Sequence, residues 1–257
     1  MSESTSDWGE RLIRILLERT GDGDPEATRR TLLKLMDLLE AVPAERPRPL
    51  EASSVNANGG YRWDHDLIER RVRPGASVLD LGCGSGTLLA RLIRSKKVRG
   101  QGIERDMEKV LQCVANGVPV FQTNLDEGLA GFPDESFDYV VLEETVQTLY
   151  RPHVVLSEML RVGRQGIISF PNFGHWQVRL DLALNGRMPV TGALPYSWHD
   201  SPNIHHLTLH DFEDWMAAQG IGIVQGHALS EGQVRPLRPD DNLFAEEVML
   251  VIERRHA

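Results

Sequence analysis

The residues with the clearest chemical potential lie in the run VLDLGCGSGTLL, at positions 78 to 89. Asp80 stands two residues before Gly82, and Gly84 and Gly86 follow at alternate positions. Glycine lets a chain turn tightly and approach a ligand closely, because it has no Cβ. An apolar strand is expected to end here and a helix to begin, which is where open α/β sheets bind ligands. The run therefore predicts a small-molecule site.

Two kinds of ligand compete for such a loop. Dinucleotide sites carry G-x-G-x-x-G and hold a pyrophosphate at the helix N-terminus, whereas this loop reads D-x-G-x-G-x-G. A carboxylate repels a pyrophosphate and attracts a cation. S-adenosylmethionine has a sulfonium, an ammonium and no phosphate. The sequence therefore favours S-adenosylmethionine, or its demethylated product S-adenosylhomocysteine, over NAD.

Three later positions carry further candidate ligand-binding residues. Glu104 closes the second expected strand, where its carboxylate can accept hydrogen bonds from two ribose hydroxyls. Asn124 and Leu125 follow the third strand, and the Asn124 amide can bond the edge of an adenine ring. Glu143 and Glu144 follow the fourth strand. Their carboxylates either attract a cationic ligand or stand in solvent, and we expect solvation.

None of these residues can be given a catalytic role from the sequence. Enzymes that methylate amide or base nitrogens often carry two prolines and an aromatic residue after the fourth strand, and this chain has EETV at 143–146. That acidic pair, His153 and His175 are the nearest candidate bases by position, but no spacing gives any of them a role. Cys83 is expected to be a small residue beneath the ligand and not a nucleophile, since no base is implied nearby.

Four histidines raise the question of a metal site. They are His199, His205, His206 and His210. A structural zinc site needs paired Cys and His ligands, and a zincin helix needs H-E-x-x-H; the chain contains neither pattern. We therefore expect loop histidines, one of them bonded to the backbone, and no metal.

Alternating strands and helices are expected to position these residues. The hydrophobic pattern from position 77 is typical of a parallel sheet covered by helices on both faces. Strands are expected at 77–81, 98–104, 118–122, 137–142 and 166–170, with helices at 87–95, 106–117 and 152–162. Two further strands, 221–229 and 243–253, are joined by a polar loop without a helix and predict a C-terminal antiparallel hairpin. The predicted fold is an α/β three-layer sandwich.

The first 59 residues differ from the rest and predict a helical extension. Residues 8–19 and 25–41 place apolar side chains at helical spacing, and Pro25 stands where a helix would begin. Prolines at positions 43, 47 and 49 then indicate an extended linker, because proline interrupts a helix. We place the boundary near residue 60, with one domain over 60–257.

The segment 173–208 is too long for an ordinary connection. A helix is expected from Trp176, followed by a loop with three prolines, and long loops inside compact domains are usually functional. Such a loop can cover an acceptor site as a lid. It can also offer Trp176, Tyr196 and Trp198 to a partner protein, because aromatic side chains are enriched in interfaces. Burial of Trp176 in the domain's own core is the third interpretation.

Composition narrows the classes of function. The 257 residues carry 28 Lys and Arg against 37 Asp and Glu, a formal net charge of -9, which disfavours sequence-independent binding to nucleic acid. The chain has no run of about 18 apolar residues that would span a membrane, and the first residues lack the basic leader of a secretory signal. With two cysteines, a disulfide framework is excluded and a reducing, cytoplasmic location is expected.

From about Tyr61 to Arg255, three-quarters of its length, the chain resembles the MetW family of methionine-biosynthesis proteins. The glycine run alone is typical of the whole class I methyltransferase superfamily, whereas PNFGHW at 171–176, followed by GRMPVT, LPY and SPNIH, is more specific. The resemblance implies a class I methyltransferase-like, or Rossmann-like, fold. The cofactor site that it implies falls on Asp80, Gly82, Gly84, Gly86 and Glu104.

The chain departs from the family pattern at two places. Thr123-Asn124 stands where the family tends to have Gly-Asp, and Glu143-Glu144 stands where it tends to have Ser-Gln. Asn124 keeps an acceptor and adds a donor, so its preference at the adenine edge can change. The second departure adds two carboxylates at the mouth of the expected site.

The resemblance also implies a role beside homoserine O-acyltransferase, MetX, with which MetW can form a complex needed for acylation. The leading hypothesis is a subunit that binds S-adenosylmethionine or S-adenosylhomocysteine, so that the pathway's end product shifts the complex between two states. The alternative is a free-standing methyltransferase acting on an unidentified small-molecule acceptor, and whether this chain is itself an enzyme stays open. A homodimer is a further possible assembly.

Overall fold

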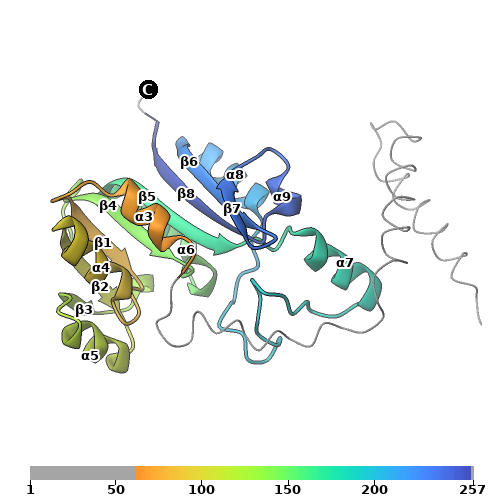
Figure 1. The fold of residues 1–257 in the computed structure, drawn as a ribbon, viewed down its shortest axis with the longest axis horizontal. Coiled ribbons are helices and arrows are strands. Elements are labelled where there is room, and N and C mark those ends of the chain that lie inside the picture. Colours follow the sequence, from red (N-terminus) through yellow and green to blue (C-terminus); the bar gives the residue numbers. More distant parts are fainter. Residues whose placement is uncertain (1–61, 256–257) are drawn as a thin grey trace, which may run out of the picture. The chain divides into compact units, whose positions relative to one another are not determined.

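The computed structural model describes residues 62–255, and Figure 1 shows them as one twisted sheet with helices on both faces. The predicted amino-terminal helices, the linker and the boundary near residue 60 lie outside the described residues. The strand order is β3-β2-β1-β4-β5-β8-β6-β7. The strands are β1 (Ser77–Leu81), β2 (Arg99–Glu104), β3 (Val120–Gln122), β4 (Phe137–Glu143), β5 (Gly163–Pro171), β6 (Ile221–Ser230), β7 (Gln233–Pro236) and β8 (Glu247–Arg254).

Helices connect the strands, and their first residues explain where they begin. The Asp106 carboxylate accepts from Glu108 N at the start of α5, and Thr208 with Asp211 forms a capping box at the start of α8. The α-helices are α3 (His65–Arg71), α4 (Thr87–Lys96), α5 (Met107–Ala115), α6 (Pro152–Val162), α7 (Trp176–Asn185), α8 (Leu209–Ala218) and α9 (Asp241–Phe244), with 3-10 turns η1 (Leu125–Glu127) and η2 (Val146–Thr148).

The parallel part of the sheet is confirmed. Strands β1 to β5 pair in parallel, while β8 is antiparallel to both β5 and β6. Among the helices of residues 62–255, none has the length and apolar character that crossing a membrane requires.

The C-terminal hairpin is antiparallel as predicted, but its connection is not a plain loop. Residues 233–236 form β7, which pairs with β6, and residues 241–244 form α9, so β8 begins at Glu247 instead of 243. The buried Asp241 carboxylate produces this turn, because it accepts from Arg238 N and pairs with Arg235 at 2.6 Å.

Buried side chains form one apolar layer on each face of the sheet. Leu142 of β4 and Phe170 of β5 belong to the layer beneath α6 and α8. Val78 of β1, Val141 of β4 and Ile167 of β5 belong to the layer that contains α3 and α4. The alternation of neighbouring residues between layers follows the period of two along a strand.

Candidate ligand-binding site

The glycine loop between β1 and α4 adopts a backbone that glycine takes without strain. Gly82, Gly84 and Gly86 have φ angles of 75°, 56° and 75°, all in the left-handed region. A Cβ on Gly82 would stand 2.7 Å from Thr145 Oγ1, whereas one on Gly84 would meet no atom within 4 Å among the described residues. Packing therefore requires glycine at 82, while the backbone at 84 is open to a ligand.

The loop lies against β2. Gly82 N and Cys83 N both donate to Ile103 O, at 2.8 and 3.0 Å, and Gly102 leaves room for Cys83, whose Sγ a Cβ at 102 would overlap. Cys83 Sγ is 3.7 Å from Cys113 Sγ. Burial raises the pKa of the Cys83 thiol. Cys83 thus has the surroundings expected of a packing residue, since a nucleophilic cysteine needs an accessible thiolate.

Glu104 holds the loop at the end of β2. The residue is 7% exposed, and its carboxylate accepts from Gly84 N at 3.0 Å on Oε2 and from Arg105 N and Asp106 N at 2.8 and 2.9 Å on Oε1. A carboxylate has about four acceptor positions, so one remains on Oε2. Glu104 can therefore accept one ligand hydroxyl in this arrangement, where the sequence alone suggested two.

Asp80 is a buried carboxylate in need of a partner. It is 2% exposed, and no residue from 62 to 255 donates a hydrogen bond to it. Burial raises its pKa well above the ordinary value, and the charges of Glu143 and Glu104 raise it further. An unpaired buried acid is unfavourable, and a cationic ligand would relieve this. Asp80 therefore fits the role expected for it toward a cationic ligand.

Alternation along the strands places five polar side chains in one row at the carboxyl end of the parallel strands. Asp80 of β1 is paired with Gly102 of β2 and with Val141 of β4. Glu104 and Glu143 lie two residues after these partners. Glu143 is paired with Ser169 of β5. Glu247 of β8 is paired with Pro171, which lies two residues after Ser169. Because side chains two positions apart share a face, the five face the side of α3. We call them the polar row.

Arg62, just before α3, supplies the main positive charge over this row. Its Nε and Nη2 donate to the Asp64 carboxylate at 3.1 and 3.0 Å. Its guanidinium also forms ion pairs with Glu143 at 3.3 Å and with Glu144 at 2.7 Å. Burial alone would raise the pKa of Asp64, but the charge and hydrogen bonds of Arg62 lower it.

The expectation that Glu143 and Glu144 are solvated is wrong. Their side chains are only 14% and 24% exposed and both pair with Arg62. Burial raises the pKa of Glu143 to about 7, the charge of Asp64 adds to this, and the His65 hydrogen bond opposes it. Sequence could not reveal this burial, because the segment that covers these carboxylates lies about 80 residues earlier in the chain.

Two further contacts fix the start of α3 over the row. Trp63 Nε1 donates to Glu247 Oε2 at 2.6 Å, and His65 Nε2 lies 3.1 Å from Glu143 Oε1. Burial and the neighbouring Glu144 carboxylate raise the pKa of Glu247 well above its ordinary value. The segment Arg62–His65 therefore touches both the middle and the β8 end of the row.

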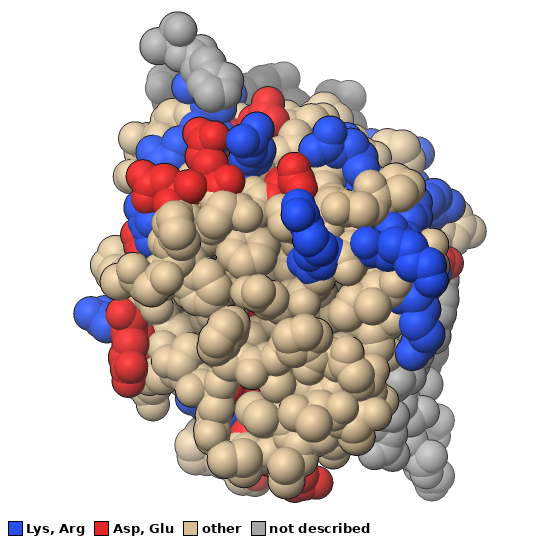
Figure 2. Space-filling model, turned by 90° about the vertical axis from the view of Figure 1, so that its left-hand side faces the viewer, with Lys and Arg blue, Asp and Glu red and all other residues tan. Residues whose placement is uncertain are grey.

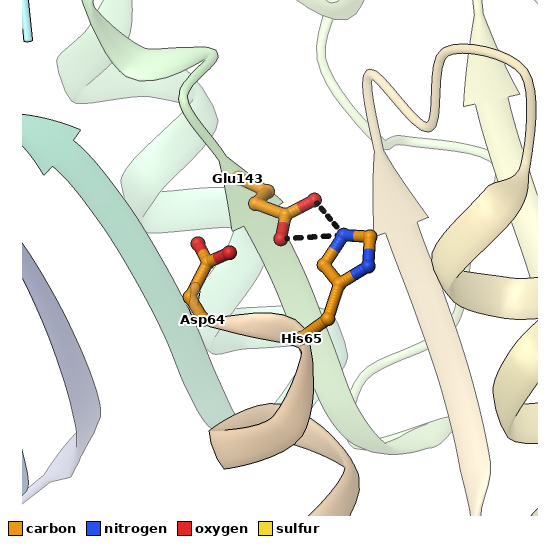
Figure 3. A group of neighbouring side chains, drawn as sticks. All are labelled: Asp64, His65 and Glu143. Carbon is orange, nitrogen blue, oxygen red and sulfur yellow. Dashed lines mark hydrogen bonds and ion pairs between the residues drawn. The ribbon is translucent and has the colours of Figure 1, made fainter. Parts of the chain in front are cut away.

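Figure 3 shows a group that could coordinate a metal: Asp64 and His65 from the start of α3 and Glu143 from the end of β4. Their ligand atoms lie within 4.8 Å of one another. Arg62, however, already bonds Asp64 and pairs with Glu143, and a guanidinium in that place repels a divalent cation. The arrangement fits an ion-pair network better than a metal centre.

The histidines that raised the metal question do not converge in the described part of the chain. His199 lies 3.2 Å from Asp200, His206 stacks on Phe173, and His210 Nδ1 is 3.0 Å from Asn242 Nδ2. His205 N donates to the Gln147 carbonyl at 3.0 Å.

The remaining sequence candidates contribute less than expected from their side chains. Asn124 Oδ1 accepts from Asp126 N at 3.1 Å and caps η1, which leaves its amide NH₂ for a ligand. The Leu125 side chain belongs to the apolar core, so only its backbone could meet an adenine ring. Burial and Arg179 lower the pKa of His175 to about 4, and His153 is exposed.

Sequence reasoning missed the residues that cover the site: Arg62, Trp63, Asp64, His65 and Glu247. The run RWDH at 62–65, which brings a guanidinium, an indole, a carboxylate and an imidazole together, was the available signal for the first four. Glu247 gave no local signal, because its place in the row depends on β8 lying beside β5.

Comparison with known proteins decides the family. A sequence model described as "Methionine biosynthesis protein MetW" matches residues 62–252. The chain belongs to the MetW family. The match covers the glycine loop, the polar row and the segment before α3, so every part of the site lies inside the region that defines the family.

This MetW-family chain is similar to the "Bifunctional methionine biosynthesis protein MetXA/MetW" of Rhodopirellula baltica, with 34% identity over 204 residues. The alignment covers 75% of this chain and 33% of that relative, so the chain spans about a third of the bifunctional protein.

Solved structures show the fold. A methyltransferase dependent on S-adenosylmethionine from Thermotoga maritima, described as a possible histamine N-methyltransferase, has a TM-score of 0.55 at 15% identity, covering 75% of this chain and 88% of its own. Another such methyltransferase, from Archaeoglobus fulgidus, has a TM-score of 0.53 at 16% identity, covering 76% and 95%. The MetW-family chain thus has the class I methyltransferase fold that the sequence predicted.

Proposed function

We propose that this chain binds S-adenosylmethionine or S-adenosylhomocysteine at the glycine loop and supports homoserine acylation by a MetX-like acyltransferase. The observation that carries the partner assignment is the fused MetXA/MetW relative, because two modules joined in one chain are held at high effective concentration. Membership of the MetW family supports the same partnership for this chain.

The residues at the loop fit such a ligand. Gly84 leaves its backbone open, Glu104 keeps one acceptor position, and Asp80 is a buried acid with no donor among the described residues. S-adenosylmethionine would supply a methyl group on a sulfonium. The chain's own residues bind and orient: Asp80 faces positive charge, Glu104 meets a hydroxyl, and Arg62 balances the buried acids.

Replacing Asp80 with alanine should weaken S-adenosylmethionine binding by roughly tenfold or more, because the ligand loses a buried charge partner. Calorimetric titration of wild type, Asp80→Ala and the exposed control Asp214→Ala measures this. Equal affinity of wild type and Asp80→Ala, or no binding to wild type, would show that the loop has been assigned to the wrong ligand.

The partnership is tested by reconstitution. A MetX-like homoserine O-acyltransferase, co-expressed with this chain, should co-purify with it, and homoserine acylation should rise when the chain is present. Absence of a complex together with unchanged acylation would remove the partner from the proposal and leave ligand binding untouched.

The loop between α7 and α8 offers the aromatic surface expected for a partner. Trp198 is 79% exposed, and Met188, Tyr196 and Ile204 of the same loop are also exposed. Backbone bonds from Ile204 N and His205 N to Gln147 O tie the loop to the β4 end of the site. Binding of a partner to this loop would therefore be coupled, through Gln147, to the conformation of the residues near the polar row.

A second exposed apolar surface, on α5 and β3, is the control for the loop between α7 and α8. Figure 2 shows the side of the molecule that carries β3 and α5, where charged side chains gather over the upper part and a broad tan area lies below them. Among the exposed apolar residues of this part of the sheet are Met107, Leu111 and Val114 of α5 and Phe121 of β3. This surface lies at the opposite edge of the sheet from β6 and β7.

Trp198→Ala should weaken acyltransferase binding by about 30-fold, equivalent to about 2 kcal/mol, and leave S-adenosylmethionine affinity within about twofold. Leu111→Ala, a 62% exposed residue on α5, is the matched control. A larger loss with Leu111→Ala would move the partner to the α5 surface. A larger effect of Trp198→Ala on the ligand than on the partner would favour a lid over an acceptor site.

The alternative, a free-standing methyltransferase for a small acceptor, is favoured by one observation. Glu143 lies at the site with a pKa of about 7, which suits a general base near neutral pH. Transfer of labelled methyl from S-adenosylmethionine to amine, thiol and hydroxyl acceptors, lost in Glu143→Gln, would support it. No transfer to any class of acceptor would count against it.

A further inference from the structure

Positive charge is scarce at the site relative to negative charge. Within the described residues, the polar row and the segment over it contain one guanidinium, Arg62, and one imidazole, His65, next to a set of carboxyl groups. These carboxyl groups are Asp64, Asp80, Glu104, Glu143, Glu144 and Glu247. Arg62 is shared among three of them, and Asp80 receives no hydrogen bond from residues 62–255.

A buried excess of carboxyl groups stays neutral by holding protons or by binding a cation. Burial raises the pKa values of Asp80, Glu143 and Glu247, which favours the protonated form of these carboxyl groups. A ligand that brings its own positive charge would replace some of those protons. The affinity of this site is therefore expected to depend on the charge of the ligand as well as on its shape.

S-adenosylmethionine and S-adenosylhomocysteine differ in that one property. Both carry an adenosine, an α-ammonium and an α-carboxylate, so contacts with those parts stabilise both ligands equally. S-adenosylmethionine alone has a methylated sulfonium, which adds one full positive charge. Only interactions with that charge can discriminate between the two molecules beyond the small contribution of a methyl group.

We propose that the buried carboxyl groups around Arg62 make this site select the sulfonium ligand, S-adenosylmethionine, over neutral S-adenosylhomocysteine. The proposal rests on the proposed function of the glycine loop as the binding site for these two molecules. It means that the chain responds more strongly to S-adenosylmethionine than to S-adenosylhomocysteine. Glu143 and Glu144, which both form ion pairs with Arg62, supply part of the negative charge.

Glu143 is the group through which the selection can be measured. The groups that face it are Arg62, Asp64 and His65 from the α3 side, Glu144 on its own strand end, Asp80 of β1, and Ser169 of β5. Below about pH 7 Glu143 holds a proton, and above it the carboxylate is charged. A nearby sulfonium lowers the pKa of Glu143, so binding it releases protons, and affinity for the cation rises with pH.

Calorimetric titration with both ligands at pH 6 and pH 8 tests the proposal. For wild type we expect S-adenosylmethionine to bind about tenfold more tightly than S-adenosylhomocysteine at pH 8, and less selectively at pH 6. Titrations in two buffers of different ionisation enthalpy should show net proton release with S-adenosylmethionine only. Glu143→Gln keeps the shape and removes the charge, so the preference should fall at least threefold and the proton release should shrink.

Glu135→Gln is the matched control, because Glu135 is exposed and precedes β4 at the opposite end of that strand; its preference should equal that of wild type. Thermal unfolding of each variant confirms that it is folded. Equal affinities for the two ligands, or an unchanged preference in Glu143→Gln, would overturn the selection and leave ligand binding standing. Failure of both ligands to bind wild type would instead overturn the proposed function, and the selection with it.

Discussion

Gly82→Ala is expected to destabilise the domain by about 2 to 4 kcal/mol and to abolish ligand binding. The φ angle of Gly82 is 75°, which an L-residue adopts with strain. The added methyl would also lie 2.7 and 2.9 Å from Thr145 Oγ1 and Cγ2, so the loop or the end of β4 must move. Thermal unfolding should show a melting temperature lower by roughly 5 to 15 °C.

Two companion variants separate strain from overlap. Gly84→Ala has a similar φ angle of 56° and no described neighbour within 4 Å, so it should cost only about 1 to 2 kcal/mol while still hindering the ligand. Gly82→Ala combined with Thr145→Ala removes the overlapping atoms and should recover most of the difference. If Gly82→Ala proved no less stable than Gly84→Ala, the close contact with Thr145 would not be a real constraint.

Glu104→Gln is expected to lower S-adenosylmethionine affinity at least about 100-fold, equivalent to about 2.7 kcal/mol. The carboxylate accepts three backbone N–H groups, and it is the only side chain shown to bond Gly84 N within residues 62–255. An amide has one oxygen, so its NH₂ must face at least one of those donors. The loop would lose its hold on β2, and stability should fall by about 1 to 3 kcal/mol.

The control for this change is Glu108→Gln, which makes the same replacement at an exposed position in the first turn of α5. Its affinity and melting temperature should match wild type. Calorimetry measures the ligand affinity of both variants, and thermal unfolding measures their stability. Wild-type affinity in Glu104→Gln would mean that ligand binding does not depend on the conformation of the glycine loop.

The prediction from sequence was most accurate where local requirements determine structure. Helix α6 (Pro152–Val162) was predicted with its observed bounds, because an initial proline and apolar spacing mark it. Helix α8 was missed although Thr208 and Asp211 form a capping box, since two residues are a weak signal on their own. The predicted loop before β8 was wrong because Asp241 and Arg235, whose pairing shapes it, carry no periodic pattern.

The candidate site also contains some residues that the sequence indicated and others that it could not. The sequence indicated Asp80, the three glycines and Glu104 from their spacing at a strand end, and the structure brings them together around the loop. It could not indicate that Glu143 is buried, because burial depends on Arg62 and His65 lying over β4. Nor could it place Glu247, which enters the row only because β8 inserts between β5 and β6.

By itself, the sequence determined the family, the strand–helix alternation and the glycine loop, since these depend on backbone freedom and on residues close together in the chain. Tertiary structure alone decided the electrostatic character of the site. Trp63 and Glu247 meet across 184 positions, and Arg62 reaches carboxylates about 80 residues away. Charges act through space and change with burial, so whether an acidic residue is solvated, paired or protonated is settled only when the chain has folded.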